Sequence, residues 1–326
     1  MSTLNDLIQV EIETFRHSTR DINFDVYLKL SDENVTHVFS RSTGLDYQRL
    51  AQYIQKGVRH LYVRKDDEAL YLEFVKRPAR AIFEDPKTTL EKRIATLLNM
   101  TEQNISEVFA QLHVQNETVE NSKAVVRSYV NLMTQSPLSL ATVLKLVSHG
   151  EYLYYHSIAV SIFSMFIARA SGHFNQRTLE IVGLGGFLHD IGSTQLPKEI
   201  VCSPQALTEE QWEEMKDHPK LGMKMLEGTK NISDEVRFIV YQHHEQPCAA
   251  GYPNGLNASS IYYPAKIVAL ADALSALISK RPFRTAYSIG DAIAIMYGEK
   301  GKYDPELLKI VASVFIPNES GLKKAA

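Results

Sequence analysis

Cysteine and tryptophan are scarce in this sequence. Its 326 residues include two cysteines, Cys202 and Cys248, and a single tryptophan. Two cysteines argue against a disulfide scaffold and favour a reducing compartment. No apolar run approaches the roughly 18 residues of a membrane-spanning helix, and the amino terminus lacks a basic segment followed by an apolar core. We therefore expect a cytoplasmic protein without a membrane partner.

A strong charge of either sign is also lacking. Lysine and arginine number 35 against 38 aspartate and glutamate residues, which gives a net charge of -3. Such a balance provides no broad attraction to nucleic acid, so we expect no DNA or RNA partner. The hydrophobic content of 44% and charged content of 22% are those of a globular protein. The length allows two domains, each with its own core.

Residues 1–85 mix strand and helix patterns, which predicts a small α+β accessory domain. Alternating apolar and polar residues predict strands, and apolar residues at helical spacing predict helices. The expected elements are strands at 24–30, 36–39 and 60–63 and helices at 46–55 and 66–74. By its placement, this domain would sense a ligand or dock a protein partner.

The rest of the chain reads as helical almost to its end. Residues 86–137 predict a helical linker with an apolar stripe, which would pack within the monomer or, alternatively, form a homodimer seam. Residues 138–316 predict an all-α domain, and 317–326 a C-terminal tail. The helices expected in that domain are Ser139–His149, Tyr152–Ala170, Gln176–Leu188, Thr208–Lys216, Lys220–Leu226, Asp234–His243, Pro264–Ser279, Ser288–Tyr297 and a last one from Pro305.

Histidines and acids are grouped in a way that indicates a metal site. The segment His243-His244-Glu245 has two adjacent imidazoles, and His189-Asp190 pairs an imidazole with a carboxylate. Imidazole nitrogens and carboxylate oxygens are ligands of Mn, Fe and Zn. A single histidine on a helix is more often an ordinary hydrogen-bonded residue, so the interpretation depends on the whole group.

Asp272 lies within the apolar segment 267–274, which we expect to be a buried helix. An uncompensated carboxylate there would cost several kcal/mol, so Asp272 needs a metal or a proton donor as its partner. A structural salt bridge would also satisfy it, but the neighbouring sequence offers no basic residue on its face. The metal is therefore the favoured interpretation.

The order His156, His189-Asp190, Asp272 resembles the H…HD…D ligand set of the HD phosphohydrolase superfamily. The matches to its HD-GYP family are His218-Pro219 with Gly222, His243-His244-Glu245, Gly251-Tyr252-Pro253 and Arg281-Pro282-Phe283-Arg284. The resemblance covers roughly residues 150–315. It implies an all-α helical bundle of the HD type after the α+β domain.

The resemblance also implies an activity. HD-GYP domains are metal-dependent phosphodiesterases that hydrolyse cyclic di-GMP to pGpG or GMP, here through a water activated by two divalent ions. Nitrogen ligands favour Fe or Mn, with Zn also suitable, over Mg. Asp190 would be the catalytic carboxylate that bridges both ions. The implied ligands are His156, His189 and Asp272 for one ion and His218, His243 and His244 for the other.

On the substrate side, the resemblance implies contacts from the Gly251–Tyr252 loop, from Arg281 and Arg284, and from position 193. Glycine permits close backbone approach, and arginine suits bidentate contact with phosphate. For Tyr252, a packed ring in a Gly-Pro turn is an equal alternative. For the two arginines, the alternative is a solvated surface pair.

The sequence departs from the family at four places. Ser193 stands where the family has lysine, Cys248-Ala249 where it has Asp-Gly, and Ser275 where it has a second aspartate. Tyr152 stands where three-metal members have glutamate, so we expect two ions. These departures leave two alternatives open. One is a weakened protein that binds metal and cyclic dinucleotide and signals through partners, and the other is an enzyme for another nucleotide phosphoester.

Overall fold

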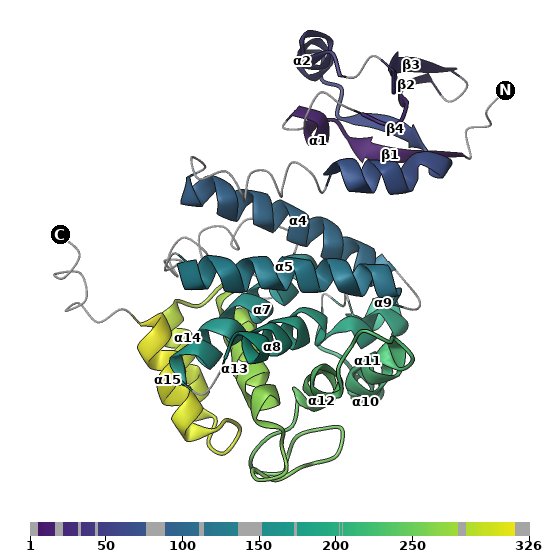
Figure 1. Cartoon of the computed structure of the whole chain (residues 1–326). Helices are drawn as coiled ribbons and strands as arrows, with labels where there is room; N and C mark the ends of the chain where they lie inside the picture. Colours follow the sequence, from purple (N-terminus) through teal and green to yellow (C-terminus); the bar gives the residue numbers. More distant parts are fainter. Residues whose placement is uncertain are drawn as a thin grey trace. The chain divides into compact units, whose positions relative to one another are not determined.

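The computed structural model describes residues 6–16, 22–31, 34–42, 45–75, 89–110, 114–135, 152–172, 175–201, 203, 205–279 and 285–316 (Figure 1). Contacts divide the chain into two compact units, Met1–Thr96 and Leu97–Ala326. The domain limits expected near residues 85 and 137 lie outside the described residues and stay predictions. The same holds for the expected helix Ser139–His149.

The first unit contains a four-stranded antiparallel sheet in the order β1-β4-β2-β3. Its strands are β1 (Leu7–Glu11), β2 (Val26–Ser31), β3 (Asn34–Phe39) and β4 (His60–Arg64). Its helices are α1 (Glu13–Arg16), α2 (Tyr47–Gln55), the short 3-10 helix η2 (Lys65–Asp67) and the helical residues 68–75. Three strands and two helices agree with the sequence predictions, whereas β1 was not predicted.

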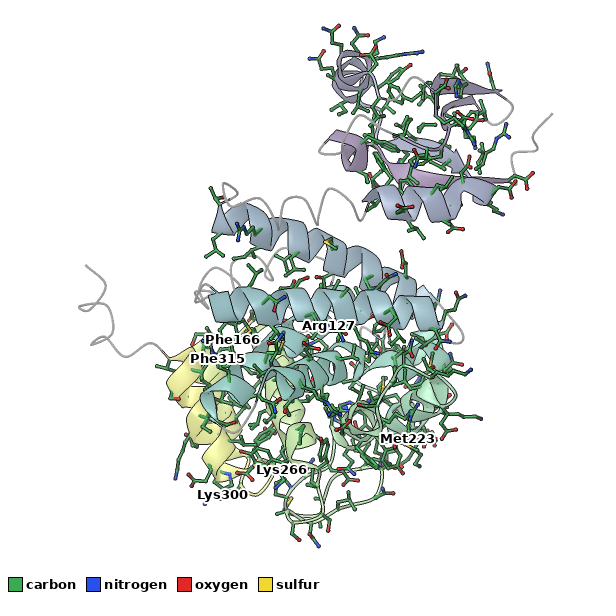
Figure 2. All side chains as sticks on the ribbon, viewed as in Figure 1. Arg127, Phe166, Met223, Lys266, Lys300 and Phe315 are labelled. Carbon is green, nitrogen blue, oxygen red and sulfur yellow. The ribbon has the colours of Figure 1, made fainter. Side chains whose placement is uncertain are left out.

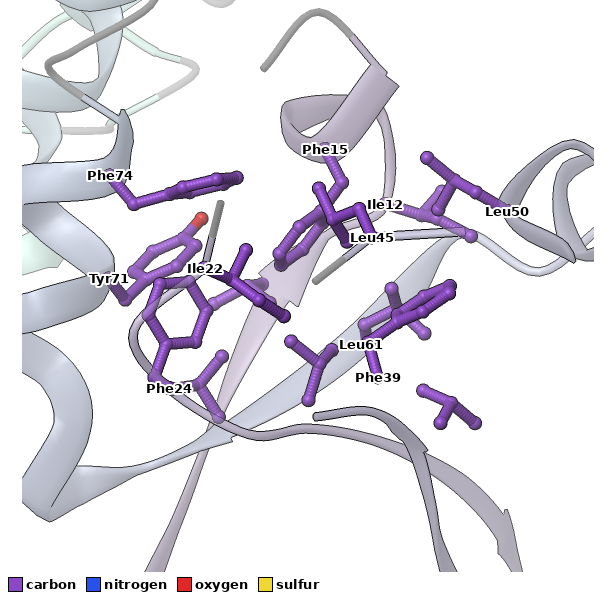
Figure 3. Close-up of a cluster of buried hydrophobic side chains, with 14 residues drawn as sticks. Ile12, Phe15, Ile22, Phe24, Phe39, Leu45, Leu50, Leu61, Tyr71 and Phe74 are labelled. Atoms are coloured by element: carbon purple, nitrogen blue, oxygen red, sulfur yellow. The ribbon is translucent and has the colours of Figure 1, made fainter. Parts of the chain in front are cut away.

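Alternation along the strands gives this unit its core. In β4, Leu61 and Val63 are fully buried, whereas the alternate residues His60, Tyr62 and Arg64 are more exposed. The buried side chains pack against aromatic rings from the helical segments (Figure 3). The rings of Phe15 and Phe24 lie 5.5 and 5.3 Å from that of Phe74. The unit therefore has a hydrophobic core of its own, as the chain length suggested.

The regular secondary-structure elements among the described residues of the second unit are all helices. Its long helices are α4 (Leu90–Ala110), which begins in the first unit, α5 (Asn116–Gln135), α7 (Tyr152–Ala170), α8 (Gln176–Leu188), α13 (Tyr263–Ile278), α14 (Ile289–Gly298) and α15 (Pro305–Phe315). The shorter ones are η3 (Ile191–Gln195), α9 (Lys198–Val201), α10 (Glu209–Met215), α11 (His218–Leu226) and α12 (Asp234–Gln242). Among the described helices, none is both long and apolar enough to cross a membrane.

Helix α7 lies at the centre of this unit, in contact with α8, α13 and α15. Its sequence is apolar on nearly every side, as expected of a helix surrounded by others, and residues 156–165 are all buried. The hydroxyl of Ser161 donates to the carbonyl of Gly183 on α8 at 2.7 Å. Phe315 of α15, labelled in Figure 2, meets Phe163 of α7 with ring centroids 5.0 Å apart.

Several helix ends meet beside α7 and α13. His189 caps the end of α8, His218 begins α11, and His243 caps the end of α12. The link between two of them depends on Gly192 in η3, where an added Cβ would collide with the carbonyl oxygen of His218 and the backbone of Gly222. Only glycine permits this approach. Helix α11 begins at His218, two residues earlier than the sequence predicted.

Candidate metal centre

Seven histidine and aspartate side chains form two adjoining clusters in the second unit. Within each cluster, the candidate ligand atoms lie within 4.8 Å of one another. One cluster contains Asp190, His218, His243 and His244, and the other contains His156, His189 and Asp272. The ring of His189 lies 5.4 Å from that of His156 and 5.0 Å from that of His243. The structure thus brings together all seven residues that the sequence suggested as metal ligands.

Three of the histidines are oriented by the same kind of hydrogen bond. The Nδ1 atom of each donates a hydrogen bond to a backbone carbonyl three residues earlier, and all three side chains are almost fully buried. The pairs are His189 with Gly186 at 2.8 Å, His218 with Met215 at 2.8 Å, and His243 with Val240 at 2.7 Å. A carbonyl oxygen can only accept, so each Nδ1 carries the proton. In the neutral ring, Nε2 then presents its lone pair to the centre of the site.

Two of these lone pairs face each other. The Nε2 atoms of His218 and His243 are 3.2 Å apart, and Oδ1 of Asp190 lies 3.3 and 3.8 Å from them. Burial lowers the pKa of His218 to about 4, so this ring is neutral near pH 7. Two acceptor nitrogens and a carboxylate oxygen at this separation repel one another unless a proton or a metal cation lies between them. The cluster could hold a divalent metal ion.

His189 supports the same conclusion. Its side chain is fully buried, and its Nε2 atom makes no hydrogen bond among the described residues, although Oδ2 of Asp190 lies 3.2 Å away. Burial opposes protonation of this ring, but the carboxylates of Asp190 and Asp272 outweigh it and raise the pKa of His189 to about 9. The electrostatic field of the two carboxylates therefore favours a positive charge at Nε2 of His189. A bound cation would provide that charge.

The other groups have the charge states that a metal site needs. Burial works against ionisation of Asp190, yet the neighbouring histidines hold the pKa of this carboxyl well below its usual range. The pKa of Asp272 is likewise lowered by His156 despite burial. Burial, reinforced by His243 and His218, lowers the pKa of His244 well below its usual value. Ionised carboxylates and neutral imidazoles are the ligand forms that bind divalent cations.

Asp272 has a histidine partner, as its position in an apolar helix requires. Its Oδ1 atom lies 3.1 Å from Nε2 of His156 on α7. On its other side, Nδ1 of His156 contacts the hydroxyl of Ser275 at 3.0 Å. Ser275 lies on the same helix as Asp272, one turn further along, and is fully buried. The sequence singled out Ser275 as a departure from the family but did not predict its contact with His156.

The Gly-Tyr-Pro segment lies against the second histidine cluster. The ring of Tyr252 stacks on His244 with centroids 4.7 Å apart and planes inclined by 27°, and its edge faces His218 at 6.2 Å. A Cβ on Gly251 would collide with the backbone of residues 244–246, so glycine permits the close approach of this segment to the histidines. The Tyr252–Pro253 peptide bond is cis.

Glu245 holds this loop, a role that the sequence analysis missed. Its carboxylate is 3% exposed and accepts hydrogen bonds from the backbone N–H groups of Asn254 and Leu256, both at 2.7 Å. Charge-assisted hydrogen bonds of this kind are the stronger ones, so Glu245 ties the far side of the loop to the end of α12. A charged residue directly after two adjacent histidines was the available signal.

The remaining predicted residues are placed as follows. Ser193 is buried in η3, and its backbone N–H donates to the carbonyl of Asp190 at 2.9 Å. Cys248 is exposed, and its N–H donates to the carbonyl of Gly301 at 3.0 Å. Arg281 and Arg284 lie outside the described residues.

Comparison with known proteins agrees with this geometry. The model of an HD domain matches residues 162–307. The cyclic di-GMP phosphodiesterase response regulator RpfG of Xanthomonas campestris is 35% identical over 133 residues, which cover 40% of this chain and 35% of that protein. A cyclic di-GMP phosphodiesterase of Pseudomonas aeruginosa is 31% identical over 173 residues, 53% of this chain and 42% of that protein. The chain thus spans less than half the length of these curated relatives.

A solved structure extends the likeness of fold. An HDG"Y"P protein from Bdellovibrio bacteriovorus has a TM-score of 0.68 and 20% sequence identity, covering 94% of this chain and 98% of that one. At this identity, the likeness concerns the fold alone. The matched domain contains the His189-Asp190 pair, the double histidine and the Gly-Tyr-Pro segment within residues 162–307. Residues 162–307 therefore match an HD domain, and the motifs within them are those that resemble the HD-GYP family.

Proposed function

We propose that this chain is a metal-dependent phosphodiesterase that hydrolyses cyclic di-GMP to pGpG or GMP. One observation carries the proposal: His218 and His243 direct their Nε2 atoms at each other, 3.2 Å apart, beside an ionised Asp190. Such an arrangement is suited to a cation and costly without one. The activity named for both curated relatives supports the choice of substrate.

Asp190 is suited to serve both clusters. Its Oδ2 atom faces His189, and its Oδ1 atom faces His218, so one carboxylate can reach two cations. We assign His156, His189 and Asp272 to one divalent ion and His218, His243 and His244 to the other. Two such ions, most suitably Fe or Mn with Zn an alternative, would supply Lewis acidity and an activated water for attack on phosphorus.

Tyr252 is the substrate contact that the described residues favour most. Burial, followed by the charges of Asp190 and Asp272, raises the pKa of Tyr252, so its hydroxyl keeps its proton at neutral pH and can donate to a phosphate or a base. The close backbone approach at Gly251 presents this ring beside His244. Substrate roles for Ser193 and the two arginines, Arg281 and Arg284, are proposed from the family resemblance alone.

The test is turnover of cyclic di-GMP by protein loaded with Mn or, without oxygen, with Fe, followed by chromatography of the products. We expect pGpG or GMP from the natural chain and none from Asp190→Ala. Asp234→Ala is the matched control, since this aspartate is 78% exposed at the start of α12 and its ion pair with Arg237 lies on the surface. That variant should retain full activity.

The alternatives are separated by the same preparation. Tight binding of cyclic di-GMP by calorimetry, without turnover under any metal, would contradict the enzyme and favour a binding protein that signals through partners. Turnover of a different cyclic dinucleotide or of a mononucleotide, with cyclic di-GMP left intact, would instead assign that nucleotide as the substrate. Ser193, Cys248, Ala249 and Ser275 are the departures that motivate this comparison.

A further inference from the structure

His156 is held differently from the other buried histidines of the site. The Nδ1 atoms of His189, His218 and His243 donate to backbone carbonyls. The Nδ1 atom of His156 instead meets the side-chain hydroxyl of Ser275 at 3.0 Å. A carbonyl only accepts, whereas a hydroxyl both donates and accepts. The tautomer of His156 is therefore not dictated by its Nδ1 partner.

Its second contact favours the opposite tautomer. Nε2 of His156 lies 3.1 Å from a carboxylate oxygen of Asp272, and a carboxylate also only accepts. When no cation is bound, the proton of His156 belongs on Nε2, donated to Asp272, while Ser275 donates its hydroxyl proton to Nδ1. Both contacts are then satisfied. Ser275 is fully buried, so solvent does not compete for its hydroxyl.

We propose that Ser275 makes the half of the site formed by His156, His189 and Asp272 a convertible metal position, which loads after the other half and more weakly. This inference rests on the proposed metal-dependent function. Loading transfers the proton of the His156 imidazole from Nε2 to Nδ1 and turns the Ser275 hydroxyl from donor to acceptor, so His156 and Ser275 together keep the same number of protons. The lone pair of Nε2 becomes available only after the hydrogen bond to Asp272 is given up.

The other half needs no such change. His218 and His243 already have Nδ1 protonated by their carbonyl contacts and Nε2 facing Asp190. A preorganised ligand set breaks no hydrogen bond when the cation binds. In the half with His156, by contrast, the hydrogen bond between His156 and Asp272 must first be broken. Partners behind a ligand histidine typically change metal affinity by about 10- to 100-fold. Ser275 acts on the cation through His156 and is thus a positioning residue.

The tautomer can be read directly by nitrogen NMR of histidine-labelled, chelator-stripped full-length protein. We expect His156 to be protonated on Nε2 and His218 and His243 on Nδ1, with His156→Gln identifying the signal. In Ser275→Asp, the new carboxylate only accepts, so His156 should shift to the Nδ1-protonated form. Finding His156 protonated on Nδ1 in the natural chain would overturn the inference, and this measurement requires neither metal nor turnover.

Metal affinity supplies the second readout. Titration with Mn²⁺, followed by calorimetry and electron paramagnetic resonance, should give one tight and one weak site in the natural chain. Ser275→Asp should tighten the weak site about tenfold, and Ser275→Ala should weaken it about tenfold by leaving a buried Nδ1–H without a partner. Ser164→Ala is the control, since this buried hydroxyl on α7 has no hydrogen-bond partner among the described residues. It should change neither site.

The outcomes separate this inference from the proposed function. Two sites of equal affinity, or a weak site unaffected by both Ser275 variants, would overturn the inference. The expected tautomers and affinities without phosphodiester turnover would overturn only the proposed enzyme. A chain that binds no metal would overturn both. If Ser275→Asp fails to fold, as judged by circular dichroism, the natural chain and Ser275→Ala still decide the matter.

Discussion

Ala249 has, at the scale of a single residue, a backbone conformation that usually requires glycine. Its φ is 61°, and among the described residues other than glycine it is the one with a positive φ. An L-residue with a Cβ in this left-handed region pays about 1–2 kcal/mol, which glycine avoids. The resemblance to the HD-GYP family places glycine at this position, and alanine therefore holds this φ at a cost in conformational energy.

We therefore expect Ala249→Gly to stabilise the protein by about 0.5–1 kcal/mol, because relief of strain exceeds the extra entropy of glycine in the unfolded chain. Chemical denaturation measures the change. Ala250→Gly is the matched control at the next exposed position, where φ is not positive, and it should destabilise instead. Equal effects of the two substitutions would contradict this account of the loop.

Asp25 gives a prediction for pH dependence. Its Oδ1 atom accepts from the backbone N–H of Arg41 at 3.0 Å, and its Oδ2 atom accepts from Nε of the same arginine at 3.2 Å. The backbone hydrogen bond, followed by the guanidinium charge and His37, lowers the pKa of Asp25. A lowered pKa means that this stabilisation is present above the unfolded value of about 4 and is lost as pH falls through the folded value.

We expect Asp25→Asn to destabilise the protein by roughly 1 kcal/mol near pH 7 and to have a vanishing effect well below pH 4. Urea denaturation at several pH values tests this. Asp66→Asn, an exposed neighbour in η2, should have little effect at any pH. A difference for Asp25→Asn that grows with acidity would show that the sign is wrong.

At the scale of elements, the contact between η3 and α11 sets the spacing of the metal centre. Gly192 lies against the carbonyl of His218 and the backbone of Gly222 with no room for a Cβ. This contact places Asp190, just before η3, within 3.3 Å of the first side chain of α11. Asp190 and His218 belong to two different short elements, so the packing of the two backbones sets the distance between these side chains.

Gly192→Ala should therefore cost about 2–4 kcal/mol, because backbone atoms cannot rearrange as flexible side chains do, and it should also weaken metal binding. Thermal denaturation and Mn²⁺ titration measure the two effects. Gly298→Ala on α14 is the control, since a Cβ there meets nothing within 4 Å; it should be neutral or stabilising. Wild-type metal affinity in Gly192→Ala would contradict the role given to this contact.

At the scale of the whole molecule, the candidate ligands are confined to one unit. All seven lie between His156 and Asp272, within the unit Leu97–Ala326. The first unit has its own aromatic core and, among its described residues, no comparable cluster of metal-binding side chains. A protein partner of the first unit, and a homodimer, stay predictions.

Metal should therefore stabilise the two units unequally. A ligand at 100 times its dissociation constant contributes about 2.7 kcal/mol to the unit that binds it. Calorimetric unfolding with and without Mn²⁺ should shift the transition of the second unit upward and leave that of the first unchanged. Chelation should reverse the shift, and Asp190→Ala should abolish it. A uniform shift of the whole profile would contradict this separation.

Strands β2, β3 and β4 and helices α7 and α8 followed closely from periodicity, because each carries its own apolar pattern. Strand β1 was not predicted, since the apolar Leu7 interrupts the alternation of apolar and polar residues along it. Its pairing with β4 joins Leu7 with Arg64 and Glu11 with His60, 57 and 49 positions apart, which local sequence cannot specify. For the same reason, the contact of Ser275 with His156, 119 residues away, was not predicted.

The sequence by itself determined which side chains are available as ligands, because histidines at helix ends and an aspartate in an apolar helix are local features. It also identified the Gly-Tyr-Pro segment beside them. Only the tertiary structure decided which nitrogen of each histidine faces the centre, because that depends on the acceptor behind each ring. Three rings meet carbonyls of their own chain segment, whereas His156 meets Ser275 from another helix. Packing between distant helices therefore makes one half of the site fixed and the other convertible.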